Sequence, residues 1–525
     1  LATTGVWVDR PYATGVQTFD FAADQFPDAQ AMIDKARGLG FRFGLWQAPY
    51  LDEEDPSTTA LRAEAKAAGY YPPETGLNLN SWGKIIDYTN PAAKAWWQDH
   101  LRAYTAMGVE GFKLDYAEDV VPDIIGARNV FVFADGSDER TMHRGYTLAY
   151  HATYAELLPE DGGLLLCRAG KWGSQVYGPI IWPGDLDARM WKHGELVTEG
   201  DETFRAVGGL HAAMIASLTL GPSGFPFYGS DTGGYRHSPP DIETFRRWFE
   251  HTALTSVMQI GTSSNDVAWE FGDQALLDSY REYTRLHLRL FPYLWSLAAD
   301  IATTGRPLQR PFGLQLPELG LHPSDQYFLG DALFVAPVTE AGAVSREVAF
   351  PPGRWVGFRD GVAVEGPTTT VVDAPLGALP FYLKAGTPLP LLRDTIDTLS
   401  PTTAPPELVD SFATDVGRLW LRLAPGPEGE AVLYDGTRAT QTPEDAGLRL
   451  AFEPGGVFVD GAVVEVFGWG GAAPSSVVVG GAPVSAAASL AALRDAESGW
   501  FFEPRAGGTV YVLLPATGGD MSVRR

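Results

Sequence analysis

Several carboxylates in the first part of the chain directly follow short apolar runs. Asp115 ends the run GFKLD, and Asp185 ends the run IIWPGD. Cleavage of a glycosidic bond needs two carboxyl groups. One attacks the anomeric carbon, and the other protonates the leaving oxygen and later deprotonates water. Asp115 and Asp185 are therefore candidates for this chemistry.

The residues around these two aspartates suggest a division of roles. Lys113 lies two residues before Asp115 and points to the same face of a strand, where its charge favours an ionised nucleophile. Asp185 follows Trp182, and desolvation beside that ring favours a protonated acid. Arg168 ends the preceding apolar run and is suited to bind sugar hydroxyls or to hold a carboxylate.

Position by itself leaves a structural interpretation open for all of these aspartates. An aspartate at the end of a strand is often the N-cap of the following helix, where it accepts backbone N–H groups. This interpretation applies to Asp9, Asp87 and Asp231, and it leaves Asp115 and Asp185 between a catalytic and a structural role.

Such carboxylates need a scaffold that brings strand ends together, and the order of elements predicts one. Short β-rich runs alternate with segments of helical period, which is typical of parallel strands wrapped by helices. The number of predicted strands fits a closed (β/α)8 TIM barrel, in which chemistry is placed at the carboxyl ends of the strands. The strands are predicted at 5–9, 41–47, 84–87, 109–116, 164–168, 180–185, 224–231 and 256–261. The helices are predicted at 28–37, from 91 through 97, and at 144–157, 203–220, 241–253 and 276–299.

The character of the chain changes after Pro307, where Gly, Pro, Val and short alternating runs predict antiparallel β-structure. A Pro/Thr-rich segment at 398–407 is interpreted as a hinge between two β-domains. The predicted fold class is therefore α/β, a (β/α)8 TIM barrel followed by two all-β C-terminal domains. The expected domains are a catalytic barrel at 1–306, a proximal β-sandwich at 307–397 and a distal β-sandwich at 398–525.

Composition narrows the class of protein further. The 525 residues carry a formal net charge of −26, which disfavours nucleic acids and anionic membranes as partners. Cys167 is the single cysteine, which excludes an intrachain disulfide and a Cys/His zinc site. The 9 histidines show no His-x-His or His-Glu-x-x-His spacing, so a metal-dependent hydrolase is disfavoured.

Several segments resemble glycoside hydrolase family 31. Residues 111–118 (GFKLDYAE) resemble its nucleophile strand in the Lys-x-Asp-x-x-Glu form of the α-xylosidase-like branch, and 181–185 (IWPGD) resemble its acid/base segment. Residues 224–235 (GFPFYGSDTGGY) are similar to its Ser-Asp-Ile-Gly-Gly-Phe block. Further similar segments lie at 87–91, 168–175, 247–248, 292–294 and 328–331. Together they run in the family's order from about residue 5 to 395.

This resemblance implies a retaining mechanism on terminal α-linked sugars, with no cofactor and no metal. Asp115 would form a covalent glycosyl intermediate and Asp185 would be the acid/base, with their carboxyl groups about 5–5.5 Å apart. The partner would be a small α-glycoside or oligosaccharide. The resemblance also assigns a sugar-binding shell, which consists of Asp9, Arg10, Trp46, Lys113, Arg168, Trp182 and Asp231.

Some residues of this shell have structural alternatives. Trp46 and Trp182 are open to interpretation as core residues, and Lys113 as the partner of Glu118 in an ion pair. Asp9 and Arg10 are expected to face the 4- and 6-position end of the sugar.

Two departures from the family's pattern concern the choice of sugar. The last predicted barrel strand holds 258–260 (MQI) where the family has Arg-x-His, and the first ends in 7–12 (WVDRPY), unlike the α-glucosidases. An α-galactosidase-like activity is therefore favoured over α-glucosidase, α-xylosidase or α-N-acetylgalactosaminidase activity. A transglycosylase or an α-glucan lyase would use the same nucleophile. A catalytically silent sugar-binding homologue is the alternative from a different class, although both carboxylates are present.

The sequence leaves the cellular compartment open between cytoplasmic and periplasmic or secreted. No signal peptide is visible, and the chain begins at Leu1 with the first predicted barrel strand close behind. The family normally has a β-sandwich before the barrel. We therefore expect a trimmed N-terminus or a missing domain.

Overall fold

The computed structural model describes residues 2–78, 80, 82–120, 128–160, 162–263, 267–505 and 507–525. It divides into two compact units, and each is described by itself. The first unit consists of Thr4–Gly184 and Thr398–Val409, and the second of Leu1–Thr3, Asp185–Asp397 and Asp410–Arg525.

The first unit is built on a five-stranded parallel sheet in the order β1-β2-β3-β4-β5. Lys113 of β3 lies opposite Trp46 of β2 on one side and Leu166 of β4 on the other. Because the strands are parallel, their carboxyl ends meet at one edge, and the residues that follow them lie together there. The strands are β1 (Gly5–Val8), β2 (Arg42–Gln47), β3 (Val109–Leu114), β4 (Leu164–Cys167) and β5 (Ile180–Ile181).

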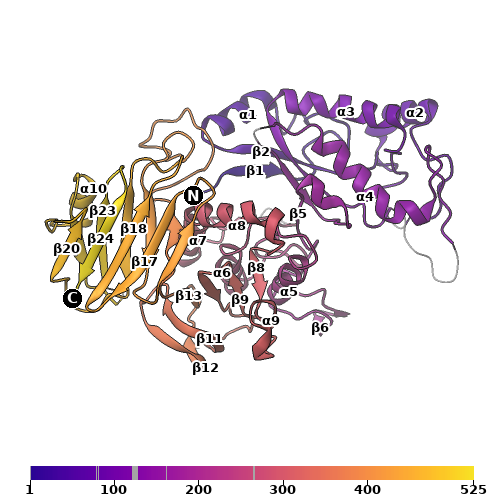
Figure 1. Ribbon diagram of the computed structural model, residues 1–525. Coiled ribbons are helices and arrows are strands. Elements are labelled where there is room, and N and C mark those ends of the chain that lie inside the picture. Colours follow the sequence, from indigo (N-terminus) through magenta and orange to yellow (C-terminus); the bar gives the residue numbers. More distant parts are fainter. Residues whose placement is uncertain are drawn as a thin grey trace. The chain divides into compact units, whose positions relative to one another are not determined.

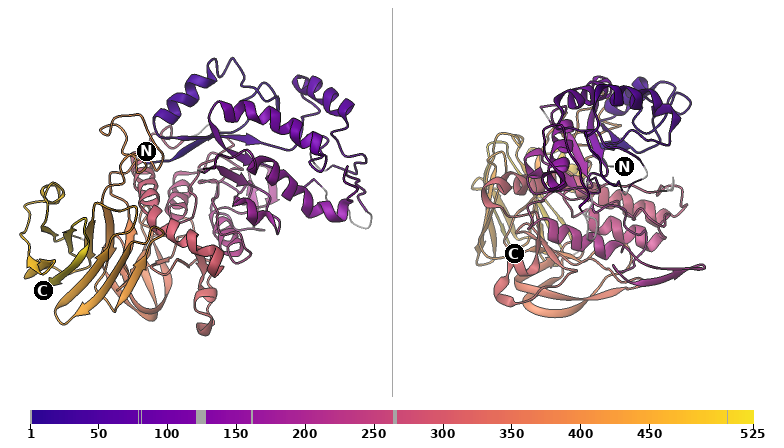
Figure 2. Two further views of the ribbon diagram at one scale, coloured as in Figure 1. Left: turned by 45° about the horizontal axis from the view of Figure 1, so that its top comes forward. Right: turned by 90° about the vertical axis from the view of Figure 1, so that its right-hand side faces the viewer.

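The helices of the first unit begin at capping residues that the sequence supplies. Asp28 caps α1 (Ala29–Gly38), and Asn90 caps α3 (Pro91–Ala106), whose proline occupies a position that needs no N–H donor. The indigo and purple helices lie along the strands of the sheet (Figures 1 and 2). The other helical segments are η1 (Pro56–Thr58), α2 (Thr59–Ala68), α4 (Glu139–Ala155) and η2 (Ser174–Tyr177).

The Pro/Thr-rich segment is anchored to this first unit by hydrogen bonds. Thr398 Oγ1 donates to the Gly40 carbonyl at 2.6 Å, and Thr402 Oγ1 donates to the Gly38 carbonyl at 2.7 Å. Gly40 has a φ of +84°, and a Cβ there would lie 2.7 Å from the Thr398 methyl group, so this contact requires a glycine. The segment is therefore a fixed part of the unit and not the free hinge that its composition predicts.

The second unit contains the helices that follow residue 185 and the hairpin of β6 and β7. The segments predicted as strands at 224–231 and 256–261 form no strand among the described residues, but they meet in an isolated parallel bridge between Asp231 and Gln259. None of the described helices is long and apolar enough to cross a bilayer. The elements are β6 (Leu196–Glu199), β7 (Glu202–Arg205), α5 (Leu210–Leu220), α6 (Ile242–Thr252), α7 (Gln274–Arg289) and α8 (Phe291–Thr304).

Three sheets follow in the same unit, and the long hairpin of β11 and β12 is prominent among them (Figure 1). The first is a six-stranded sheet of order β12-β11-β13-β10-β9-β8, with β8 (Gln309–Pro311), β9 (Tyr327–Leu329), β10 (Leu333–Val335), β11 (Ser345–Gly357), β12 (Ala363–Asp373) and β13 (Phe381–Lys384). The short helices α9 (Phe312–Gln315) and η3 (Pro317–Leu319) follow β8.

The remaining two sheets are formed by the C-terminal strands. One has the order β14-β15-β19-β23-β22, with β14 (Leu389–Leu391), β15 (Leu419–Leu423), β19 (Ala462–Phe467), β22 (Trp500–Glu503) and β23 (Thr509–Leu514). The other has the order β16-β17-β18-β24-β20-β21, with β16 (Gly429–Val432), β17 (Arg438–Glu444), β18 (Gly447–Glu453), β20 (Ser476–Val479), β21 (Ala482–Pro483) and β24 (Gly519–Arg524). Helix α10 (Leu490–Arg494) lies between β21 and β22 in the sequence.

Arg247 ties α6 to the β-structure of its own unit. Its side chain is buried, forms an ion pair with Glu250 at 3.0 Å, and donates to the carbonyls of Ala343 at 2.8 Å and Ala374 at 2.7 Å. The neighbouring Trp248 is also fully buried. Residues 247–248, which resemble a family motif, therefore have a structural role here.

The strand predicted at 84–87 is wrong. β2 pairs directly with β3, and Ile85 makes only a single antiparallel bridge. The Asp87 carboxylate accepts the N–H groups of Thr89 at 3.0 Å and Ala134 at 2.7 Å. The apolar run is thus part of a buried turn that Asp87 holds in place, in keeping with the structural interpretation of this residue.

Two predicted helices also differ from the structure. The residues at 203–205 belong to β7, and the helix begins only at Leu210. The helix predicted at 276–299 is divided into α7 and α8, with Pro292 near the start of the second. Proline has no N–H to donate to the preceding turn and fits the first turn of a new helix instead.

Candidate active site

Asp115 directly follows β3, and three donors hold its carboxylate. Trp46 Nε1 donates to Oδ2 at 3.0 Å, and the Tyr116 backbone N–H donates to Oδ1 at 2.9 Å. A guanidinium nitrogen of Arg168 lies 2.7 Å from Oδ1. The side chain is 16% exposed, so it is fixed in orientation but reachable from solvent.

The turn after Asp115 has a strained backbone. Tyr116 and Ala117 have φ angles of +62° and +81°, in the left-handed region that side-chain-bearing residues rarely adopt. Ala117 is buried, and its carbonyl accepts the Thr147 hydroxyl at 3.3 Å, which helps to hold the turn. The strained backbone thus lies at the turn in which the Tyr116 N–H donates to the Asp115 carboxylate.

Arg168 joins Asp115 to a second carboxylate. Its other terminal nitrogen lies 2.6 Å from Glu118 Oε1, and its guanidinium carbon lies 4.1 Å from the centre of the Tyr116 ring. Burial opposes the charge of Arg168, but Asp115 and Glu118 raise its pKa above the ordinary value. Arg168 therefore holds carboxylates, which is one of the two roles that the sequence suggests.

Lys113 lies in an aromatic and acidic surrounding at the same edge of the sheet. Its Nζ is 3.3 Å from Asp9 Oδ2, 4.0 Å from the centre of the Trp7 ring and 4.8 Å from that of Trp182. Burial raises the pKa of Asp9, while Lys113 acts in the opposite direction. The ion pair between Lys113 and Glu118, considered from the sequence, is wrong, because Glu118 pairs with Arg168.

Arg10 lies exposed beside this group. Its guanidinium carbon is 4.9 Å from the centre of the Trp82 ring and 5.8 Å from that of Trp46, and its backbone N–H donates to Asp9 at 2.8 Å. Arg10, Trp46 and the loop at 11–17 line a small cavity of about 130 Å³. Seven predicted site residues of the first unit are thus connected: Asp9, Arg10, Trp46, Lys113, Asp115, Arg168 and Trp182.

The other two predicted residues belong to the second unit. Asp185 is exposed. Asp231 is only 2% exposed, and its Oδ1 accepts the Gln259 Nε2–H at 2.8 Å. Asp231 is therefore engaged in a buried contact between two neighbouring segments.

Asp187, two residues after Asp185, fixes the loop that carries the candidate acid/base. Its buried carboxylate is 3.0 Å from His237 Nδ1 and accepts the Gly208 N–H at 2.8 Å. The Leu186 carbonyl accepts two further backbone N–H groups. In the sequence, only the position of Asp187 two residues after Asp185, in the run GDLD, points to this residue.

Sequence reasoning also missed residues of the first unit. Trp7 and Trp82 contact the ammonium of Lys113 and the guanidinium of Arg10, and Tyr116 stacks on Arg168. Trp7 and Tyr116 adjoin predicted site residues in the sequence, so proximity was a signal for them. Trp82 lies in a loop that is distant in the sequence from the predicted site residues, and no local pattern indicates its role.

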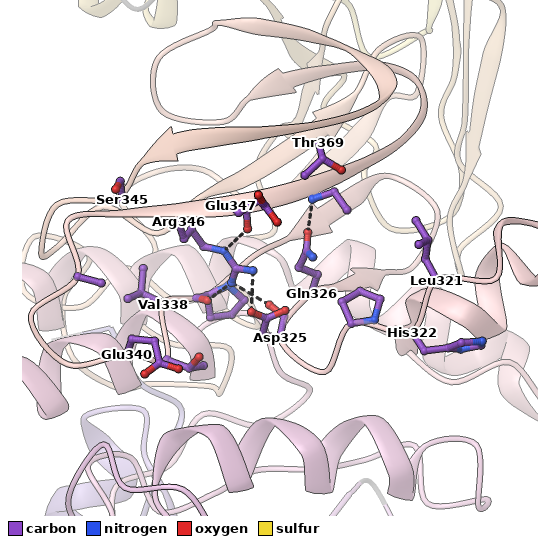
Figure 3. Close-up of a pocket in the computed structure, with 15 residues that line it drawn as sticks. Leu321, His322, Asp325, Gln326, Val338, Glu340, Ser345, Arg346, Glu347 and Thr369 are labelled. Atoms are coloured by element: carbon purple, nitrogen blue, oxygen red, sulfur yellow. Dashed lines mark hydrogen bonds and ion pairs between the residues drawn. The ribbon is translucent and has the colours of Figure 1, made fainter.

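A larger cavity than the one beside Arg10 lies in the β-structure of the second unit (Figure 3). It has a volume of about 610 Å³, and within it Arg346 forms an ion pair with Asp325 at 2.9 Å. None of its 15 described lining residues is Phe, Tyr or Trp. In the described part of the chain, no three His, Cys, Asp or Glu side chains gather as a metal site.

Two family models match consecutive parts of the chain. Residues 2–297 match the TIM-barrel domain of glycosyl hydrolases family 31, and residues 305–389 match the C-terminal domain of the same family. The chain therefore belongs to glycoside hydrolase family 31, and its fold is a TIM barrel followed by C-terminal β-structure. The resemblance and the fold class are confirmed. The α-xylosidase/α-galactosidase-like branch is not specifically supported, because differently named relatives are similarly related.

The curated relatives include hydrolases and a transferase. An α-xylosidase of Emericella nidulans is 30% identical over 393 residues, which are 71% of this chain and 46% of that protein. An isomaltosyltransferase of Sporosarcina globispora is 27% identical over 519 residues, which are 91% of this chain and 44% of that protein. The chain thus spans about half the length of these relatives.

Solved structures of the family share the fold. The cycloalternan-forming enzyme of Listeria monocytogenes, in complex with a pentasaccharide substrate, has a TM-score of 0.77 and 22% identity, with 99% of this chain and 49% of that chain covered. A Flavobacterium johnsoniae dextranase complexed with isomaltotriose has a TM-score of 0.80 and 20% identity, with 99% and 66% covered.

Proposed function

We propose that the chain carries the active site of a retaining, exo-acting α-glycoside hydrolase. The observation that carries this proposal is the clamp on Asp115 by Trp46, Tyr116 and Arg168 at the carboxyl end of a barrel strand. A carboxylate held by three donors is oriented before substrate binds, as nucleophilic attack on an anomeric carbon requires. Membership of a family of glycosyl hydrolases supports the same reaction class.

In the proposed mechanism Asp115 attacks the anomeric carbon and forms a glycosyl ester, while Asp185 protonates the leaving oxygen. Asp185 then takes a proton from water, and that water displaces Asp115. Arg168 keeps Asp115 in place and balances its charge before attack and after release. The buried anchor at Asp187 holds the loop of Asp185. A retaining reaction needs the two carboxyl groups to be about 5–5.5 Å apart, which stays a prediction.

We further propose that Asp9, Arg10, Trp46, Lys113, Arg168 and Trp182 form the sugar-binding shell. Lys113 and Asp9 offer paired donors and acceptors to hydroxyl groups, and Arg10 lies at the exposed side. For Asp231 we propose an indirect role, in which it orients Gln259 toward the pocket.

For the sugar itself we propose an α-galactoside. The stretch 258–260 (MQI) stands where the family has Arg-x-His, so Ile260 takes the place of the histidine, while Gln259 donates to Asp231. A changed hydroxyl contact supports a glycone other than glucose. The named α-xylosidase and α-glucosidase relatives support xylose and glucose as alternatives. The relative named isomaltosyltransferase supports transfer to a sugar acceptor as a second reaction of the same site.

A panel of 4-nitrophenyl α-glycosides tests both the reaction and the sugar. The panel contains the galactoside, glucoside, xyloside and N-acetylgalactosaminide, and we expect release of 4-nitrophenol to be fastest from the galactoside. Proton NMR of the first product distinguishes retention, which gives the α-anomer, from inversion. Cleavage of no compound would support the silent sugar-binding homologue instead, and a first β-product would contradict the double displacement.

The proposed domains keep the predicted bounds, with the barrel at 1–306 and the two β-sandwiches at 307–397 and 398–525. The match of residues 305–389 to the family's C-terminal domain is compatible with the first boundary. Limited proteolysis followed by mass spectrometry tests the second. β14 precedes residue 397 and pairs with β15, which follows it. A cut at 397 would therefore place these two paired strands on different fragments.

A further inference from the structure

Trp172 is highly exposed to solvent on the loop that follows β4. Its side chain is 76% exposed, and among the described residues no other tryptophan has so large an exposed fraction. Val176, four residues further along the chain, is 78% exposed. An exposed indole keeps a large apolar surface in contact with water, which is unfavourable compared with burial. A bound partner that covers this surface would recover that free energy, so a binding role is worth testing.

The loop that presents Trp172 is rigidly built. The Ser174 N–H donates to the Lys171 carbonyl at 2.8 Å, and the Gly173 N–H donates to Gln175 Oε1 at 2.8 Å. Gly173 has a φ of +110°, a conformation that disfavours any side chain, and Ser174 is buried. Trp172 is therefore held outward by its own loop and does not simply lie at the tip of a loose one.

Trp172 is four residues from Arg168, the residue that contacts Asp115. Four residues span at most about 14 Å, so the Cα atoms of Arg168 and Trp172 lie within that distance of each other. Loops at the carboxyl ends of barrel strands are the places where substrates extend out of the pocket.

We propose that Trp172 is the platform for the sugar on the leaving-group side of the cleaved bond, so that the enzyme prefers oligosaccharides over glycosides of small alcohols. This inference rests on the proposed glycosidase function. The flat indole matches the apolar face of a pyranose ring, and Lys171 and Gln175 place donors beside it for hydroxyl groups. The same platform receives a sugar acceptor when the glycosyl intermediate is transferred.

The size of the exposed patch favours a sugar over a protein partner. Specific protein interfaces bury about 1,200 Å² or more, which the side chains of Trp172 and Val176 cannot supply alone. One indole, in contrast, covers one sugar ring.

The test compares two substrates that share a glycone and differ in the leaving group. One is an α-linked disaccharide and the other the corresponding α-glycosyl fluoride, which has no leaving sugar. We expect Trp172→Ala to lower the ratio of the two kcat/KM values roughly tenfold, which corresponds to about 1.4 kcal/mol. Trp172→Phe, which retains an aromatic face, should restore most of the ratio. The fraction of glycosyl transferred to added disaccharide should fall with it.

Trp295→Ala is the matched control, because Trp295 is also a largely exposed tryptophan but lies on α8. Its ratio should equal that of the wild type. An unchanged ratio in Trp172→Ala, or an equal loss on both substrates, overturns the inference while the hydrolase function stands. A change of oligomeric state in light scattering, with an unchanged ratio, shows an interface between copies instead. If the wild type hydrolyses neither substrate, the proposed function fails and this inference fails with it.

Discussion

The edge of the parallel sheet around Asp115 and the large cavity beside β11 differ in what surrounds their charged groups. At the sheet edge, Arg168 bridges two carboxylates, Lys113 lies between aromatic rings, and an indole N–H reaches Asp115. The cavity is far larger, at about 610 Å³, but its Arg346 is engaged with one carboxylate, and its described lining includes no Phe, Tyr or Trp.

The comparison favours the sheet edge as the proposed catalytic place on its contacts and not on its volume. Reactive carboxylates need fixed orientation and charges that balance them, and both come from direct contacts. Aromatic side chains supply the apolar faces that sugar rings bind. Of these two places, only the sheet edge combines oriented carboxylates, balancing charges and aromatic faces, although the cavity associated with it measures about 130 Å³.

The largest effect is expected from removing one carboxylate at the sheet edge and, separately, one in the large cavity. We expect Asp115→Ala to lower kcat by roughly 10⁴-fold, because the nucleophile is lost. Asp325→Ala, in the large cavity, should leave kcat/KM within about twofold of the wild type. Hydrolysis that persists in Asp115→Ala would show that the sheet edge is not the catalytic place, and a large loss in Asp325→Ala would point to the cavity.

The next effect concerns the clamp on the nucleophile. Arg168→Ala should lower kcat by about 10²-fold or more, since Asp115 loses both its cationic partner and part of its orientation. Arg168→Lys keeps the charge without the two-pronged contact and should recover part of the loss. Steady-state kinetics and circular dichroism are measured together, so that an unfolded variant is recognised. A kcat equal to that of the wild type would contradict the role of the clamp.

A smaller effect distinguishes Asp231 from the sugar-binding group. Asp231→Ala leaves the buried Gln259 amide without this acceptor and should lower the free energy of unfolding by about 1–3 kcal/mol. Urea unfolding measures the loss, and Asp278→Ala, at an exposed helical position, should change it by less than about 0.5 kcal/mol. Full stability together with a raised KM would mean that Asp231 binds substrate directly.

The smallest effect is a pH dependence that comes from Asp9. Burial raises the pKa of Asp9 above its ordinary value of 3.8, so the folded chain binds this proton more tightly than the unfolded chain. Its contribution to stability is therefore greatest below pH 3.8 and declines as the pH rises through the raised pKa.

Asp9→Asn removes that dependence. The stability of the variant relative to the wild type should therefore increase between about pH 3 and about pH 6, as urea unfolding at several pH values would show. Glu118 and Asp119 also have raised pKa values from burial, and both remain in the variant and in the wild type. A difference that is constant with pH would show that Asp9 is not desolvated in the folded chain.

Much of the architecture was predictable from local patterns. The caps at Asp28 and Asn90 and the apolar runs of β1 to β4 act over a few residues, so the sequence alone indicated parallel strands wrapped by helices. The same locality explains the error at 84–87, because a short buried turn and a short buried strand have the same apolar pattern. Only pairing with a neighbouring strand distinguishes them.

The sequence by itself determined which aspartates are candidates, since strand ends and the neighbouring motifs are local features of the chain. It did not determine which cation meets which carboxylate. Lys113 is closer to Asp115 in the sequence, but it is Arg168, from the next strand, that contacts both Asp115 and Glu118. Tertiary structure decided this, because parallel pairing brings the ends of separate strands together, and side chains far apart in the chain then become the nearest charges. The platform proposed at Trp172 depends on the same fact, since exposure is a property of the folded chain alone.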